Sequence, residues 1–174
     1  GEGSIYPSGP QCHQTMAGMK REVEKLIQKL QLQPLQGEGG YFRRLYTFSD
    51  NGAALGSTIY YLMTGQSFSS LHFLPTAEVW YFLEGCEARQ LVLQPDGSHT
   101  ERILGRASDG YDPVITVEGG CWQGTKPVQE DGWTLCATTM VPPYDGQSYR
   151  QGDRSLLVQY PSCSSIEEFL SKEE

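Results

Sequence analysis

Short apolar and aromatic runs, separated by turn-forming residues about every eight to twelve positions, dominate this chain of 174 residues. Turn signals of Gly, Pro, Asn and Asp are strongest at 49–52, 95–97 and 131–132. The runs between turns predict about ten strands, at 41–48, 56–64, 67–74, 78–83, 86–93, 99–104, 113–117, 121–126, 133–141 and 154–160. This spacing predicts an all-β sandwich or barrel.

One amphipathic helix is expected before the first strand, over residues 16–31. Val23, Ile27 and Leu30 fall on one face at helical spacing, and charged residues occupy most of the other positions. A helix with one apolar stripe buries that stripe against another element, so we expect it to pack on a sheet.

The two ends of the chain differ in character. Residues 164–172 predict a short helix, because Ser164 and Glu167 have the spacing of a capping box. Residues 1–15 are rich in Gly and Pro and predict a flexible tail. Residues 16–174 contain no obvious linker or repeat, so we expect a single domain there.

The charge of the chain is acidic, with 13 Lys and Arg against 21 Asp and Glu and a formal net charge of −8. This balance weighs against binding to nucleic acid polymers, which requires clustered cations, and against anionic membrane surfaces. No apolar run approaches the roughly 18 residues that a membrane span requires. The start of the sequence has no signal-peptide pattern, so a cytoplasmic location is favoured while a secreted one stays open.

Five cysteines are present, an odd number that cannot pair completely within one chain. Cys12 and Cys163 lie near the two ends and could form a disulfide that joins them. The alternative is a set of free thiols, some of them buried.

A histidine and a glutamate flank the turn at Pro75. His72 lies near the end of one predicted strand and Glu78 begins the next, so a hairpin would bring the two side chains together. An imidazole and a carboxylate suit Zn, Fe, Ni or Mn, with the amide of Gln123 as a weak third ligand. The alternative is a buried, hydrogen-bonded polar cluster without a metal.

Two adjacent arginines, Arg43 and Arg44, lie in a predicted strand. Neighbouring side chains of a strand point to opposite faces, so at most one of them faces an interior. We expect Arg43 to bind an anionic ligand; the alternative is that both arginines are solvated.

The spacing around His72 resembles the first sequence motif of the cupins. His72, Glu78 and Gly85 have the spacing of that motif, but Leu74 stands in place of its second histidine. The segment around Gly120 is similar to the second cupin motif, and there Gln123 stands in place of the last histidine.

Further segments resemble the cupin-5 group, small single-domain cupins of unknown function in the RmlC-like superfamily. The similar segments are residues 38–43, 57–62, 72–80, 122–123 and 141–145. The sequence departs from that group at Leu71, Phe73 and Ala77, beside His72. The resemblance implies a double-stranded β-helix (the cupin jelly-roll barrel) that usually forms a homodimer and holds a small-molecule site inside the barrel.

The resemblance also places the expected site residues. His72 and Glu78 are the expected catalytic residues, and with Gln123 they are the expected ligands of any divalent metal. Strand parity extends the inner face of such a barrel to further side chains. The expected ligand-binding residues are Ser70, Trp80, Cys121, Gln123, Tyr61 and Arg43.

Three functions fit these residues, and the sequence does not decide whether the chain is an enzyme. The first is a small-molecule-binding cupin with isomerase or epimerase activity on a sugar or nucleotide-sugar. In it His72 is the base, Glu78 orients it, and Tyr60, Tyr61 or Tyr144 is the acid. The second is a binding or storage cupin without activity. The third is a metal-dependent oxygenase, which usually needs more strong ligands than this chain offers.

Overall fold

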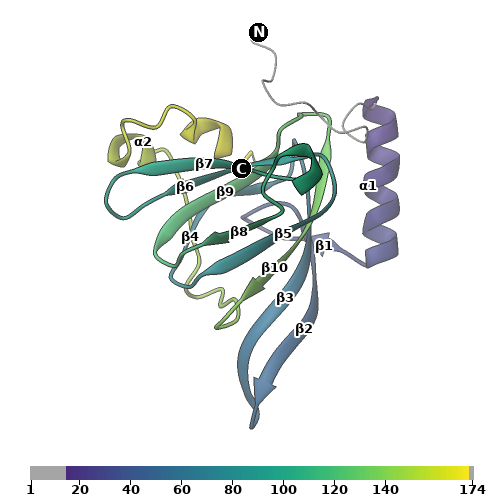
Figure 1. The fold of residues 1–174 in the computed structure, drawn as a ribbon, viewed down its shortest axis with the longest axis horizontal. Coiled ribbons are helices and arrows are strands. Elements are labelled where there is room, and N and C mark those ends of the chain that lie inside the picture. The colour runs from purple at the N-terminus through teal and green to yellow at the C-terminus, as the bar shows by residue number, and fades with distance from the viewer. Residues whose placement is uncertain (1–14, 173–174) are drawn as a thin grey trace.

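The computed structural model describes residues 15–172 and contains two antiparallel sheets that face each other (Figure 1). The first sheet has the order β1 (Gln33–Pro34), β2 (Tyr41–Asp50), β3 (Ala53–Thr64), β10 (Trp133–Met140), β5 (Glu78–Gly85) and β8 (Val114–Val117). The second has the order β11 (Arg150–Gln151), β4 (Ser69–Leu74), β9 (Cys121–Pro127), β6 (Ala88–Leu93) and β7 (His99–Leu104). The predicted all-β jelly roll is confirmed.

Successive strands cross between the sheets, so residues distant in sequence meet inside the barrel. β4 pairs with β9 in one sheet, and β5 pairs with β10 and β8 in the other. The turn at Pro75 therefore joins strands of different sheets. The expected hairpin pairing of β4 with β5 is wrong, and His72 and Glu78 instead lie on facing walls of the barrel.

Three apolar clusters hold the layers together. The first fills the barrel between the sheets and includes Met63, Trp80 and Ile115. The other two lie on the outer faces, one under α1 and one under the C-terminal segment. Each sheet is therefore covered on part of its outer face as well, which hides apolar side chains from water.

The N-terminal helix α1 (Met16–Leu30) forms where the apolar periodicity predicts it and packs beside the first sheet (Figure 1). The Thr15 hydroxyl caps it by accepting a hydrogen bond from the Gly18 amide at 3.0 Å. Met19 and Val23 are buried against Leu62 and Trp133 of the sheet. Within residues 15–172, no helix combines the length and apolarity needed to cross a bilayer.

The predicted strand at 154–160 is wrong, because this segment contains the short helix α2 (Leu156–Gln159). The Asp153 carboxylate accepts a hydrogen bond from the Ser155 amide at 2.9 Å, which bends the chain before the helix. Leu156 and Tyr160 are buried four residues apart while Val158 is 82% exposed, which is the spacing of a helix. The sequence does not show this spacing, because exposed and buried positions of the segment are both apolar.

The C-terminal helix is shorter than predicted, a single 3₁₀ turn, η3 (Ile166–Phe169). Its N-cap is Ser165 and makes no side-chain capping bond, so the capping box that starts at Ser164 does not form. Ile166 and Phe169 instead anchor the turn by burial against the second sheet.

Cys163 is a buried free thiol, so the possible disulfide between Cys12 and Cys163 does not form. Its expected partner Cys12, like the predicted flexible tail up to residue 14, lies outside the described residues. Cys121 and Cys136 are also buried free thiols.

Candidate functional site

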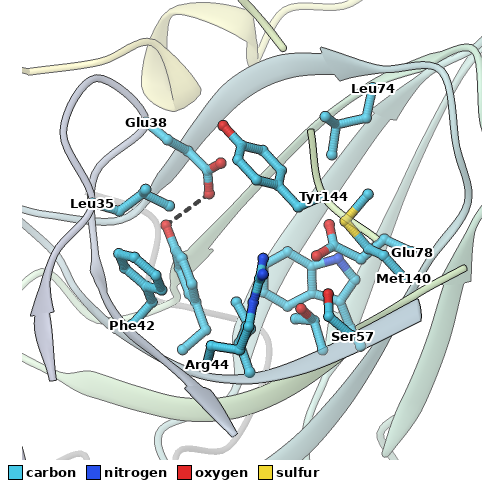
Figure 2. Close-up of a pocket in the computed structure, with 13 residues that line it drawn as sticks. Leu35, Glu38, Phe42, Arg44, Ser57, Leu74, Glu78, Met140 and Tyr144 are labelled. Carbon is cyan, nitrogen blue, oxygen red and sulfur yellow. Dashed lines mark hydrogen bonds between the residues drawn. The ribbon is translucent and has the colours of Figure 1, made fainter. Parts of the chain in front are cut away.

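A cavity of about 270 Å³ opens between the inner face of the first sheet and the loops at one end of the barrel (Figure 2). Its wall combines apolar side chains with two carboxylates, one arginine, two tyrosines and two small hydroxyls. The lining residues are Leu35, Glu38, Phe42, Arg44, Ser57, Ile59, Tyr61, Leu74, Glu78, Trp80, Thr138, Met140 and Tyr144.

Glu38 enters the cavity from the loop between β1 and β2. Gly39 and Gly40, with φ of 106° and 76°, turn the chain sharply after it. A Cβ on Gly40 would lie 2.6 Å from the Tyr61 hydroxyl oxygen, so the close approach requires glycine. Glu38 Oε2 accepts hydrogen bonds from the Tyr61 hydroxyl at 2.8 Å and from the Ser69 hydroxyl at 2.9 Å.

His72 lies behind the cavity wall rather than on it. It is 1% exposed, and its ring stacks on Tyr149 with centroids 5.5 Å apart. Nδ1 donates to the Ser70 carbonyl at 2.7 Å, because a carbonyl can only accept. Nε2 therefore faces Glu38, with Oε1 3.8 Å away. His72 and Glu38 form a buried pair, and of the two only Glu38 lines the cavity.

Glu78 lines the cavity from β5 and is only 6% exposed. Burial first, and then the negative charge of Glu38, raise the pKa of this carboxyl from its ordinary value of 4.5 to about 7. The charge of His72 and hydrogen bonds from Thr138 and Gln123 act in the opposite direction. Near neutral pH both protonation states of Glu78 are populated, which is the condition for a general acid–base group.

Gln123 is held by two partners at once. Its Oε1 accepts a hydrogen bond from the Trp80 indole N–H at 3.0 Å, which leaves its amide N–H groups to bind Glu78. The Tyr61 ring meets the edge of Trp80 with centroids 5.7 Å apart. Side chains from both sheets thus fix the orientation of Glu78.

These residues do not fit a metal centre. Nε2 of His72 is directed at Glu38, and the only oxygen of the Gln123 amide is engaged by Trp80. Leu74 offers no donor where the cupin motif has its second histidine. Among residues 15–172, no group of three or more His, Cys, Asp or Glu side chains is arranged to hold a metal ion.

Of the three tyrosines considered as the acid, two line the cavity and one does not. Tyr60 points away from the barrel and packs in the cluster under α1. Tyr61 and Tyr144 line the cavity. The pKa of both is raised, first by burial and then by the negative charge of Glu38, so each phenol stays protonated at neutral pH.

The other expected ligand-binding residues lie off the cavity wall. The Ser70 hydroxyl donates to the Glu38 carbonyl at 2.6 Å, and the Cys121 thiol donates to the Gln94 side chain at 3.2 Å. Arg43 points to the outside and donates to the Leu30 carbonyl at the end of α1, at 3.4 Å. The structure brings Tyr61, Trp80 and Glu78 together, but not these three.

Two charged cavity residues, Glu38 and Arg44, are not among the site residues expected from the sequence. The glycines around Glu38 signal a tight loop, but no local rule shows that this loop folds into the barrel. For Arg44 the parity argument applies, but it does not say which of two neighbouring arginines faces inward.

Comparisons with known proteins agree with this fold. The sequence matches the family described as "Cupin superfamily (DUF985)" over residues 24–151. The chain belongs to this cupin family. No curated protein gives a significant match to the sequence.

Three of the solved structures that resemble this cupin show the range of the likeness. A protein of Shewanella oneidensis is 29% identical, with a TM-score of 0.76 over 87% of this chain and 98% of its own. A hypothetical protein of Leishmania major is 24% identical, with a TM-score of 0.74 over 86% and 98%. A cupin-2 domain protein of Rhodospirillum rubrum is 17% identical, with a TM-score of 0.57 over 79% and 85%. The two more distant likenesses concern the fold alone.

Proposed function

We propose that this cupin binds a small organic molecule in the barrel cavity and moves a proton on it, as an isomerase does. The observation that carries the proposal is the position of Glu78, a buried carboxyl on the cavity wall whose pKa is raised to about 7. Such a group removes a proton from a carbon beside a carbonyl and returns it, without a cofactor.

In this proposal the other polar groups support Glu78. Hydrogen bonds from Thr138 and Gln123 orient its carboxylate. The protonated phenol of Tyr144, on the wall of the same cavity, donates to an oxygen of the ligand that gains charge during proton transfer. His72 is a positioning residue, which acts on Glu38 and through its charge on Glu78.

The size of the cavity favours a ligand of one ring. Its volume of about 270 Å³ is below the usual range of pockets for drug-sized ligands, roughly 300–1,000 Å³. A monosaccharide is small enough, while the nucleotide part of a nucleotide-sugar would extend past the mouth. Trp80 and Phe42 offer the apolar surface on which the C–H face of a sugar packs.

Solvent deuterium exchange tests the proposal. Neutral monosaccharides and acidic ones (sugar acids and sugar phosphates) are incubated with the protein in D₂O, and deuterium at carbon is followed by NMR. Glu78→Gln should lower the exchange rate by about 100-fold or more. Glu84→Gln is the matched control, because Glu84 lies on the same strand but is exposed. Exchange that Glu78→Gln leaves unchanged would refute the role of Glu78.

A binding protein without activity is the second candidate. The observation in its favour is the position of His72 behind the cavity wall, stacked on Tyr149, so that none of the described residues lining the cavity is a histidine. Sugar binding by the wild type, combined with no deuterium exchange over days, would support this candidate over the isomerase.

A further inference from the structure

Arg44 is the one cation among the residues that line the cavity. Figure 2 shows its side chain reaching from β2 toward the space between Phe42 and Glu78. Arg44 pairs with Ile59 of β3, and both side chains line the cavity. The pairing then shifts, so that Tyr46 faces Thr58 and Leu45 is an extra residue. The bulge thus follows directly after the cavity-facing arginine.

No carboxylate of the described residues 15–172 pairs with Arg44. Some other arginines do have such partners: Arg89 contacts Glu101 and Glu168, and Arg102 contacts Asp112. Glu38 and Glu78 share the cavity with Arg44, yet neither forms an ion pair with it; Glu38 is bound by Tyr61 and Ser69 instead. Arg44 is itself exposed at the mouth of the cavity, so its hydrogen-bond donors are bound by water and are available to a group that enters from solvent.

We propose that Arg44 binds an anionic group of the ligand, a carboxylate or a phosphate, and so selects small acids over neutral molecules of the same size. A guanidinium presents a planar fork of N–H donors that matches the oxygens of both groups. This inference rests on the proposed function, because it takes the same cavity as the ligand site. It adds that the ligand is an acid with its charge at Arg44 and its reacting carbon nearer Glu78.

The rest of the cavity limits where the negative charge can lie. Glu38 and Glu78 would repel an anion on their side, while Leu35, Phe42 and Ile59 give the same cavity an uncharged apolar surface. An acid with an apolar or ring-shaped body therefore has one favourable orientation. Its charged group lies at Arg44 and its body lies along the apolar wall toward Trp80.

Paired probe molecules test the inference without knowledge of the natural ligand. Benzoate and benzyl alcohol have the same ring and nearly the same size, but only benzoate is charged. Binding is followed by NMR through the indole N–H signal of Trp80, because the Trp80 side chain lines the cavity while its N–H donates to Gln123. We expect benzoate to bind at least tenfold more tightly than benzyl alcohol. Phenyl phosphate in place of benzoate shows whether the site prefers phosphate or carboxylate.

The two neighbouring arginines provide the matched variants. Arg44→Gln should weaken benzoate binding at least tenfold and leave benzyl alcohol unaffected. Arg43→Gln removes the same charge one residue away, outside the cavity, and should change neither. Thermal melting of both variants verifies that they are folded.

Three results would overturn the inference. They are equal affinity for benzoate and benzyl alcohol, equal effects of the two variants, and no benzoate binding up to about 50 mM, far above the affinity expected of a fragment held by an arginine. Failure of the proposed function is seen separately, as missing deuterium exchange, and leaves anion binding at Arg44 in place.

Discussion

Replacement of Glu78 by glutamine should stabilise the protein, and the gain should grow with pH. The pKa of this buried carboxyl is raised from 4.5 to about 7. The folded protein therefore binds more protons than the unfolded chain between these values, and its free energy of unfolding falls as pH rises through this interval. Glutamine has nearly the same shape and never ionises, so the variant avoids this loss.

The magnitude follows from the shift in pKa. A tenfold change in proton affinity is worth about 1.4 kcal/mol, so ionising Glu78 in the fold costs roughly 3 kcal/mol at pH above 8. Part of the stabilisation gained by the substitution is lost, because glutamine places an N–H₂ group where Glu78 has an acceptor oxygen for the donors Thr138 and Gln123. We expect a net gain of about 1–3 kcal/mol at pH 8.5, or roughly 3–10 °C in melting temperature for a chain of this length. At pH 4.5 the gain should be close to zero or negative.

The assay is thermal unfolding by circular dichroism from pH 4.5 to 8.5, on wild type, Glu78→Gln and the exposed control Glu84→Gln. The difference in melting temperature between each variant and wild type is the quantity compared, because it removes the pH dependence of all other groups. A difference for Glu78→Gln that is constant over this range would show that the carboxyl titrates normally in the fold, and the proposed acid–base role would lose its basis.

Three further substitutions test other parts of the structure. Tyr61→Phe removes the hydrogen bond to Glu38 and should lower the free energy of unfolding by about 1–2 kcal/mol in urea titration; no loss would mean that Glu38 finds another donor. Gly40→Ala should destabilise more than Gly52→Ala and weaken ligand binding, since both glycines have positive φ but a Cβ meets Tyr61 only at Gly40. Equal melting temperatures would contradict this. Leu156→Ala should cost about 2–4 kcal/mol by leaving a cavity under the C-terminal segment, and native-state proteolysis there should accelerate.

Much of the fold could be predicted because the strands alternate and their turns carry strong signals. The hairpin of β6 and β7 turns at Gly97, with φ of 91°, where the sequence has Pro-Asp-Gly. Prediction failed at 154–160, where the helical spacing of the buried Leu156 and Tyr160 is hidden by the apolar residues between them. The segment is too short for its pattern of apolar residues to distinguish a strand from a helix.

The candidate site was predicted less completely, because its members come from separate segments. Glu78 and Trp80 follow from strand parity and the cupin resemblance, and both line the cavity. His72 and Gln123 lie close by but behind the wall. Only the three-dimensional structure shows that Glu38 and Arg44 reach the same space, because loop position and the inward side of β2 depend on tertiary packing.

The segment from Val141 to Tyr149 links the two sheets and touches both halves of the site. Its Tyr144 lines the cavity, and its Tyr149 stacks on His72. The segment leads into β11, which pairs with β4 at His72. The two tyrosine rings are themselves in contact, with centroids 6.4 Å apart. An inserted or deleted residue between them would move one ring off its partner, so relatives that use this cavity in the same way should keep the length of this connection even where its sequence drifts.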